Sequence, residues 1–125
     1  MPARETVEAF VAQVVRGEHV EAIRDWYADD ASMQENQDAP RTGHEVLMEG
    51  ERQTLARTAE GRTELLSPPL VDGDRVVIHW RFTFVSRKGH AASFEELALQ
   101  EWRGDKVWRE RFFYDPAQMQ RATAP

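Results

Sequence analysis

Apolar residues in the first part of the chain recur with the period of an α-helix. The sequence predicts a first helix that ends before Gly17, because glycine commonly terminates helices. A second helix is predicted to follow at once, with Val20, Ile23 and Tyr27 on its apolar face. The apolar stripe of the first helix, spaced i, i+3, i+4, i+7 and i+8, consists of Val7, Phe10, Val11, Val14 and Val15.

A third helix is predicted further along. Thr42 or Gly43 would cap its start, and with Thr42 as the cap Glu45 would complete a capping box. The helix would continue to about Ala59, and Gly61 would end it. Its inward-facing residues would be Leu47, Met48 and Leu55.

From residue 62 onward the hydrophobic period changes from that of a helix to two, which is typical of strands. Upstream, a short extended segment is expected at 31–36 and a turn at 37–40. Pro68 and Pro69 lack a backbone N–H, so the first of the later strands should be bent or lie at an edge. Turns containing glycine separate the predicted strands, which are 62–71, 75–86, 91–103 and 106–114.

The order of these elements, helix–helix–strand–helix followed by four strands, predicts an α+β fold. Three N-terminal helices would pack on a curved, mainly antiparallel sheet, with an aromatic-lined pocket between the two layers. Residues 1–115 would form a single domain of common size, and residues 116–125 a frayed C-terminal tail.

Side-chain alternation along the last three strands defines two sheet faces of different character. The first face is rich in aromatic residues and would carry Val76, Ile78, Trp80, Phe82, Phe84, Phe94, Glu96, Ala98, Gln100, Trp102, Trp108, Glu110, Phe112 and Tyr114. The second face mixes charges with apolar residues and would carry Val77, His79, Arg81, Thr83, Val85, Glu95, Leu97, Leu99, Glu101, Val107, Arg109, Arg111 and Phe113.

The aromatic face allows two interpretations, a solid core or the wall of a cavity. Glu96, Gln100 and Glu110 on the same face favour the cavity, because a carboxylate in plain hydrocarbon is costly without a partner or water. The sequence therefore predicts an apolar pocket for a small apolar or aromatic organic ligand. Its expected lining residues are Trp26, Met33, Met48, Trp80, Phe82, Glu96, Trp102, Phe112 and Tyr114.

Composition excludes several classes of protein. The net charge of −6, from 22 acidic and 16 basic residues, disfavours nucleic acid as a partner. The chain has no cysteine, so disulfides and thiolate metal sites are excluded. The N-terminus lacks the layout of a signal peptide, and no apolar run approaches the roughly 18 residues of a membrane span. We expect a cytoplasmic protein with no membrane partner.

Four segments resemble one protein family. Residues 26–36 resemble the end of the second helix and the first strand of ketosteroid isomerase-like proteins, and 40–44 the segment that leads into their third helix. Residues 101–107 resemble their last hairpin, and 109–116 the ending of the SnoaL-like branch. The resemblance covers nearly the whole chain. It implies the nuclear transport factor 2-like (cystatin-like) fold, with a cone-shaped pocket and frequent dimers.

The resemblance also assigns a candidate catalytic residue. Steroid isomerases hold their general base in the first strand, at the place where Glu35 stands here. The places of their two oxyanion donors correspond to Phe10 and Ala98, which cannot donate a hydrogen bond. Steroid isomerisation by that mechanism is therefore not expected. The alternative donors are Tyr114, Trp102, Trp108 and His44.

Each candidate for catalysis also has a structural explanation. Glu35 is a candidate general base, or a carboxylate at the pocket mouth that is bonded to Arg41 or to a helix N-terminus. Glu110 is a candidate pocket acid or base, or half of a buried structural pair. His44 is a candidate ligand or catalytic group, or a packing residue in the first turn of its helix. No metal spacing, nucleotide motif or nucleophile motif is present, so no metal and no cofactor are expected.

Three kinds of function remain open at this point. The first is a cofactor-free isomerase, cyclase or lyase that uses a carboxylate base. The second is a non-catalytic module that binds a small molecule in the same pocket, and the third is a dimeric partner module. A homodimer is expected through the outer sheet face, which carries Arg81, Leu97, Leu99, Arg109, Arg111 and Phe113.

Overall fold

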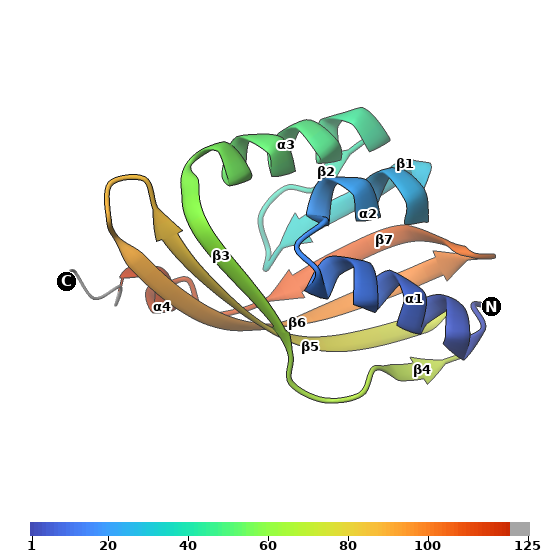
Figure 1. Cartoon of the computed structure of the whole chain (residues 1–125). Coiled ribbons are helices and arrows are strands. Elements are labelled where there is room, and N and C mark those ends of the chain that lie inside the picture. The colour runs from blue at the N-terminus through green and yellow to red at the C-terminus, as the bar shows by residue number, and fades with distance from the viewer. Residues whose placement is uncertain (121–125) are drawn as a thin grey trace.

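The structure, a computed structural model, describes residues 1–120 of the chain (Figure 1). Its four helices are α1 (Arg4–Val15), α2 (His19–Trp26), α3 (His44–Ala56) and α4 (Ala117–Gln120). Its seven strands are β1 (Tyr27–Glu35), β2 (Arg41–Thr42), β3 (Thr58–Leu65), β4 (Leu70–Asp72), β5 (Arg75–Ser86), β6 (Ala91–Arg103) and β7 (Lys106–Phe113).

The strands form one curved, unclosed sheet in the order β2-β1-β7-β6-β5-β3, with β4 paired to β5 outside this path. All pairings are antiparallel except that of β1 with β7, which is parallel. Helices α1, α2 and α3 lie over one side of the sheet, and α4 lies near the far end of β6 (Figure 1). The predicted α+β architecture with a mainly antiparallel sheet is confirmed.

The count of helices differs from the prediction of three. The fourth helix, α4, lies in the segment expected to be a frayed tail, of which residues 121–125 fall outside the described part of the chain. The Gln118 side chain holds α4 to β6, because its Oε1 accepts from the Glu95 N–H at 2.9 Å and its Nε2 donates to the Glu95 carbonyl at 3.1 Å. At least the beginning of the tail is therefore ordered against the sheet.

Of the two glycines assigned to the ends of the third helix, Gly61 is corrected, whereas Gly43 is confirmed as one of the two predicted caps. The helix ends at Ala56, and Gly61 lies inside β3, where a Cβ would stand 3.6 Å from the Phe84 ring. At the other end Gly43 is the cap residue, with no side-chain hydrogen bond, so the capping box of Thr42 and Glu45 does not form. Helix period and strand period overlap between residues 56 and 62, which made this boundary ambiguous from sequence.

The prolines act as predicted on the strand expected at 62–71. That strand is interrupted: β3 ends at Leu65 and β4 begins at Leu70, with Pro68 and Pro69 between them. Strand β3 also lies at the edge of the sheet. An edge position and a break are the two arrangements in which a residue without an N–H does not cost a ladder hydrogen bond.

The inner face of the sheet is buried as the alternation predicts on β5 and β6. Five consecutive inward positions of β6 are all buried, from Phe94 to Trp102. On β7 the pattern is broken, because Glu101 pairs with Arg109 whereas Trp102 pairs with Val107, which leaves Trp108 as an extra, bulged residue. Val107 is therefore the buried residue, and Trp108 faces outward, opposite to the prediction.

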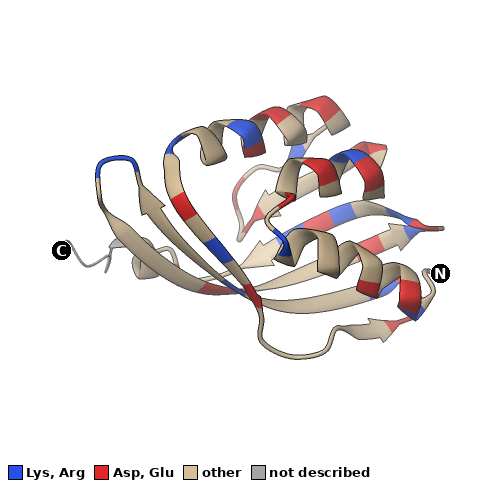
Figure 2. Cartoon of the chain, in the orientation of Figure 1, with Lys and Arg blue, Asp and Glu red and all other residues tan. Residues whose placement is uncertain are grey.

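The core forms where the helices meet the inner sheet face. The predicted stripe of α1 supplies Val7, Phe10 and Val11, which are at most 5% exposed. Phe10 makes edge contact with the Trp102 ring at 5.9 Å between centroids. No helix among residues 1–120 is long and apolar enough to cross a membrane. Figure 2 shows acidic residues distributed along α1, α2 and α3, not collected in one patch.

Two glycines at the start and middle of α3 should respond in opposite directions to substitution by alanine. Gly43 has φ +112°, a region that side chains rarely adopt, so Gly43→Ala should lower the free energy of unfolding by about 1–3 kcal/mol. Gly50 lies within the exposed helix, and a Cβ added there would meet nothing within 4 Å, so Gly50→Ala should raise it by about 0.5–1 kcal/mol. Urea unfolding of both variants measures the two changes in the free energy of unfolding. A stabilised Gly43→Ala variant would contradict the positive φ of Gly43.

Candidate functional site

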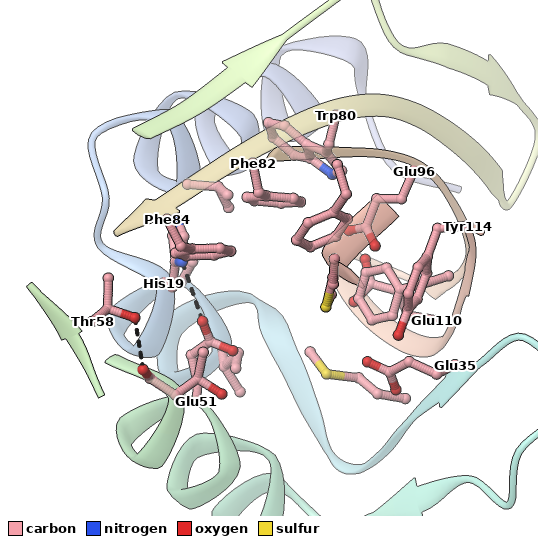
Figure 3. Close-up of a pocket in the computed structure, with 18 of the residues that line it drawn as sticks. His19, Glu35, Glu51, Thr58, Trp80, Phe82, Phe84, Glu96, Glu110 and Tyr114 are labelled. Carbon is pink, nitrogen blue, oxygen red and sulfur yellow. Dashed lines mark hydrogen bonds and ion pairs between the residues drawn. The ribbon is translucent and has the colours of Figure 1, made fainter. Parts of the chain in front are cut away.

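A cavity of about 540 Å³ lies between the helices and the inner face of the sheet (Figure 3). This size falls within the range of pockets that hold small organic ligands. Aromatic rings form a continuous part of its wall, since Phe82 contacts Trp80, Phe84 and Phe94, and Phe94 contacts Tyr114 at 5.5 Å between centroids. The side chains of His90 and Met119 at its border are exposed, which marks the direction of its mouth.

Most residues expected to line a pocket do line this cavity. They are Met33, Trp80, Phe82, Glu96, Phe112 and Tyr114, together with Glu35 and Glu110. Strand β1 contributes because its parallel pairing with β7 places Met33 beside Glu110 and Glu35 beside Phe112. Two strands that are far apart in sequence thus supply neighbouring carboxyl groups to one wall.

Three residues expected at the pocket lie elsewhere. Trp26 ends α2 and donates its indole N–H to Gln13 Oε1 at 2.7 Å, so it joins α2 to α1. Trp102 is buried one layer behind the cavity, against Phe10. Met48 is part of the core under α3. All three belong to the core or pack against it, so inward orientation alone did not distinguish core from cavity wall.

His44 does not reach the cavity. Its Nε2 lies 3.0 Å from the Ile23 carbonyl and 3.2 Å from the Arg24 carbonyl, at the end of α2. The Ile23 carbonyl also accepts the backbone N–H of Tyr27, so the imidazole N–H adds a further hydrogen bond to the last turn of α2. The structure thus places His44 as a link between α3 and α2 and not among the groups that could contact a ligand.

Glu110 accepts hydrogen bonds at both of its oxygens. The Tyr27 hydroxyl donates to Oε1, and the Gln100 side-chain N–H donates to Oε2 at 2.7 Å. The Gln100 oxygen in turn accepts from the Trp102 indole at 2.9 Å, which fixes the orientation of the amide. Burial raises the pKa of Glu110 to about 7 even though both donors oppose the rise. Glu110 is therefore held largely as a buried structural group, and its partners, Tyr27 and Gln100, are neutral.

Glu96 is the opposite case. It is 7% exposed, it lines the cavity, and within residues 1–120 no side chain or backbone group forms a hydrogen bond with its carboxyl group. Burial, reinforced by the negative charges of Glu110, Glu35 and Glu51, raises its pKa to about 9. At neutral pH the Glu96 carboxyl is protonated, so it can donate a hydrogen bond into the cavity.

Glu35 is half-buried and pairs with Arg41 of β2, with Oε2 of the carboxylate 2.9 Å from a guanidinium nitrogen. Burial raises the pKa of Glu35, and the Arg41 charge opposes the rise. The pairing with Arg41 is the structural alternative named for this residue, and the position on the cavity wall is the one a base requires. Both descriptions apply to the same side chain.

Among the polar cavity residues that were not foreseen, His19 and Glu51 contact each other. His19 Nδ1 lies 3.2 Å from Glu51 Oε1, and both residues line the cavity. The sequence did hold one signal: Glu51 follows Leu47 by four residues and so falls on the inward stripe of α3. No such signal marks His19, because its partner comes from another element. Within residues 1–120 no three His, Asp or Glu side chains are grouped as a metal ion requires.

Comparison with known proteins identifies the fold independently. A family model described as SnoaL-like domain matches residues 7–110. No curated protein sequence matches the chain significantly. The solved structures that resemble it include a candidate SnoaL-like polyketide cyclase from Mesorhizobium loti, with 22% identity, TM-score 0.77, and coverage of 91% of this chain and 100% of that one.

Two further solved structures have the same fold with different ligands or activities in their names. A ketosteroid isomerase-like protein from Catenulispora acidiphila, in complex with trimethylamine, shows 19% identity, TM-score 0.76, and coverage of 92% and 88% of the two chains. An epoxide hydrolase of M. tuberculosis shows 16% identity, TM-score 0.75, and coverage of 93% and 84%. At these identities the likeness establishes the fold alone.

The buried carboxyl groups predict a measurable dependence of stability on pH. The folded-state pKa of Glu96, about 9, lies above the ordinary value of 4.5, so the folded protein binds this proton more tightly than the unfolded chain does. Its contribution is fully present below pH 4.5 and is lost as pH rises toward 9, by up to about 1.4 kcal/mol per pH unit. Glu110, whose pKa is raised to about 7, should also lower the stability of the fold as pH rises from 4.5 to about 7.

Glu96→Gln removes the titratable proton of the carboxyl group and keeps the shape of the side chain. The free energy of unfolding of the variant, relative to the native protein, should therefore increase as pH is raised from 5 to 8. Chemical denaturation at several pH values measures the difference. Parallel pH profiles for the two proteins would show that Glu96 is not held protonated by the fold.

Proposed function

The chain belongs to the family of SnoaL-like domains, and on that premise we propose that its cavity binds a small aromatic or apolar ketone and catalyses a cofactor-free proton transfer on it. The observation that carries this proposal is the pair formed by Glu35 and Glu96. Both line one apolar cavity, but one is paired with a guanidinium and the other has no partner and is protonated. Environments that push two carboxyl groups toward different protonation states supply a base and an acid at the same pH.

Glu35 is the proposed general base. Arg41 favours its ionised form, and partial burial strengthens it as a base compared with an exposed carboxylate. The carboxylate would remove a proton from the carbon next to the ligand carbonyl, and the electron pair of that C–H bond would move into an enolate. A half-buried carboxylate in an aromatic wall suits this step because the substrate must displace little water to reach it.

Glu96 is the proposed hydrogen-bond donor to the carbonyl oxygen. A neutral carboxyl group that donates where negative charge develops stabilises the enolate more than the ketone. Glu96 would thus act as the oxyanion donor. Steroid isomerases hold their two oxyanion donors at the places of Phe10 and Ala98, which cannot donate a hydrogen bond. Tyr114 also lines the cavity near Glu96 and is the second candidate donor (Figure 3). Burial is the main cause that raises the pKa of its hydroxyl group.

The fate of the enolate distinguishes three related reactions. Return of the proton to a different carbon makes an isomerase, attack on a second carbonyl of the same molecule makes a cyclase, and expulsion of a group from the next carbon makes a lyase. All three need the same base and donor and no cofactor. The names of the cyclase candidate and the epoxide hydrolase among the structural relatives support an enzyme of this general kind.

A non-catalytic binding module is the second candidate function. The observation that favours it is the Glu35–Arg41 ion pair, which satisfies the carboxylate without any ligand. In that case the aromatic wall and the donor at Glu96 would serve affinity only. Proton exchange from a bound ketone separates the two functions, since it needs a base and binding does not.

Replacement of Glu35 by glutamine should abolish proton transfer while the fold persists. We expect the native protein to accelerate deuterium uptake at the α-carbon of 1-tetralone or another ketone from an aromatic panel, measured by NMR in D₂O. Glu35→Gln should reduce this rate by roughly 10²–10⁴-fold, the usual cost of losing a general base. Glu8→Gln, at an exposed position of α1, is the matched control and should leave the rate unchanged.

Two results would contradict the assignment. Full exchange activity in Glu35→Gln would make Glu35 a structural carboxylate. Binding of ketones without any acceleration by the native protein would favour the binding module.

A homodimer through the outer sheet face is the assembly we propose. That face exposes Leu97 by 45% and Phe113 by 36%, next to each other across β6 and β7. A groove of about 550 Å³ adjoins them, bordered by Trp108 and by Arg109, whose guanidinium lies 4.0 Å from the indole centroid. Apolar residues surrounded by charges of both signs suit an interface formed by two copies of one surface.

Sedimentation should show a dimer at micromolar concentration, and Leu97→Glu should convert it to monomer by placing an unpaired charge in the interface. Val46→Glu provides the control, because Val46 is 54% exposed on α3, on the other side of the sheet. Only monomer in the native protein, or loss of the dimer with Val46→Glu, would count against the proposed surface.

A further inference from the structure

The cavity has a second cluster of polar groups, on the side away from Glu35, Glu96 and Glu110 in Figure 3. His19, the first residue of α2, lies between two partners from different elements. Its Nδ1 is 3.2 Å from Glu51 Oε1 of α3, and its Nε2 is 2.9 Å from Thr63 Oγ1 of β3. The ring is also held by edge contact with Phe82, at 5.9 Å between centroids.

The hydrogen-bond directions in this cluster follow from the chemistry of its members. A carboxylate only accepts, so the Nδ1–H of His19 donates to Glu51. In the neutral ring Nε2 then accepts, and the Thr63 hydroxyl donates to it. The side chain of His19 is 11% exposed and that of Glu51 is 27% exposed, so both are oriented and largely shielded from water.

One oxygen of this oriented carboxylate has no partner. Glu51 lines the cavity, its Oε1 is engaged by His19, and within residues 1–120 no group forms a hydrogen bond with Oε2. Thr63 does not line the cavity, so it acts on this cluster from behind. An acceptor that is held in place and directed toward an apolar cavity selects a hydrogen-bond donor, because a carbonyl or an anion there would be repelled.

We propose that Glu51, positioned by His19, is a second binding site within the cavity that accepts a hydrogen bond from a hydroxyl group of the ligand. The cavity then has two ends of opposite polarity, a donor at Glu96 and an acceptor at Glu51, with Phe82 and Phe84 between them (Figure 3). A ligand that matches both ends is an aromatic compound with an acceptor on one side and a hydroxyl on the other. The requirement for an acceptor on the ligand, opposite Glu96, rests on the proposed function. The requirement for a hydroxyl group, opposite Glu51, does not.

The test compares matched probes that differ by one hydroxyl. Binding of 2-naphthol and 2-methylnaphthalene to the whole protein, measured by calorimetry or NMR titration, tests the Glu51 end alone, because neither probe has a carbonyl. We expect 2-naphthol to bind more tightly by roughly ten- to a hundredfold, the value of a hydrogen bond to a charged group. The pair 6-hydroxy-1-tetralone and 1-tetralone repeats the comparison with the ketone present.

Variants assign the preference to Glu51. Glu51→Met keeps the length of the side chain without an acceptor and should remove the preference for the hydroxyl, with affinity for 2-methylnaphthalene unchanged within about twofold. Glu51→Gln keeps a neutral acceptor and should give an intermediate preference. Glu49→Gln, at an exposed position of the same helix, is the control and should leave the preference intact.

Thr63→Val separates binding from a purely structural role. This variant breaks the same chain of hydrogen bonds without altering the cavity wall, so it should lower stability while most of the hydroxyl preference remains. The proposal is overturned if Glu51→Met keeps the preference, if Thr63→Val removes it as fully as Glu51→Met does, or if the native protein shows none or binds neither naphthalene. Hydroxyl preference without ketone exchange would leave this site standing and reject the proposed proton transfer.

Discussion

The free-energy cost of placing carboxyl groups in an apolar cavity governs the rest of this structure. Water would stabilise each charge, and the aromatic wall that replaces water cannot. The chain meets this cost in four different ways. Glu110 accepts two hydrogen bonds, Glu96 retains its proton, Glu35 pairs with Arg41, and Glu51 accepts from His19. Because the solutions differ, four residues of one type acquire different charges and different hydrogen-bonding capacities in a single space.

The architecture serves this separation through two features of the sheet. The parallel pairing of β1 with β7 brings Glu35 and Glu110 onto one wall, while β6 carries Glu96 on the next strand. The bulge at Trp108 shifts the face of β7 by one residue, so that Val107 fills the core behind the site and Glu110 remains inward. Without the extra residue at Trp108, regular alternation along β7 would place Val107 and Glu110 on opposite faces of the sheet, because they are three residues apart.

The sequence was most informative where a regular period continued without interruption. Alternation on β5 and β6 predicted the inner face correctly, including the inward direction of Glu96 and Gln100. It did not predict the bulge at Trp108, because a register shift depends on the partner strand and leaves no periodic trace. Tyr27 was placed on a helix but begins β1, where the strand takes over directly from α2 without a turn residue.

The site was predictable in its acids and less so in their partners. Carboxylates on an aromatic face are visible in a sequence, and Arg41 was close enough along the chain to be named as the partner of Glu35. The contact of His19 with Glu51 joins residues 32 positions apart on two helices. His44 lies within hydrogen-bond distance of two carbonyls at the end of another helix. Such contacts depend on how helices pack, which a pattern along one helix does not specify.

The parallel β1–β7 pairing also has a consequence for the order in which the molecule assembles. Strand β1 lies in the first third of the chain and its partner in the last, so the loop that closes when they pair includes most of the fold. Closing so long a loop is slow and is favoured only after the intervening hairpins have formed. We therefore expect the wall that joins Glu35 to Glu110 to be completed late in folding. Until then the aromatic face stays open to water, and the unusual acidities that depend on its dryness do not exist.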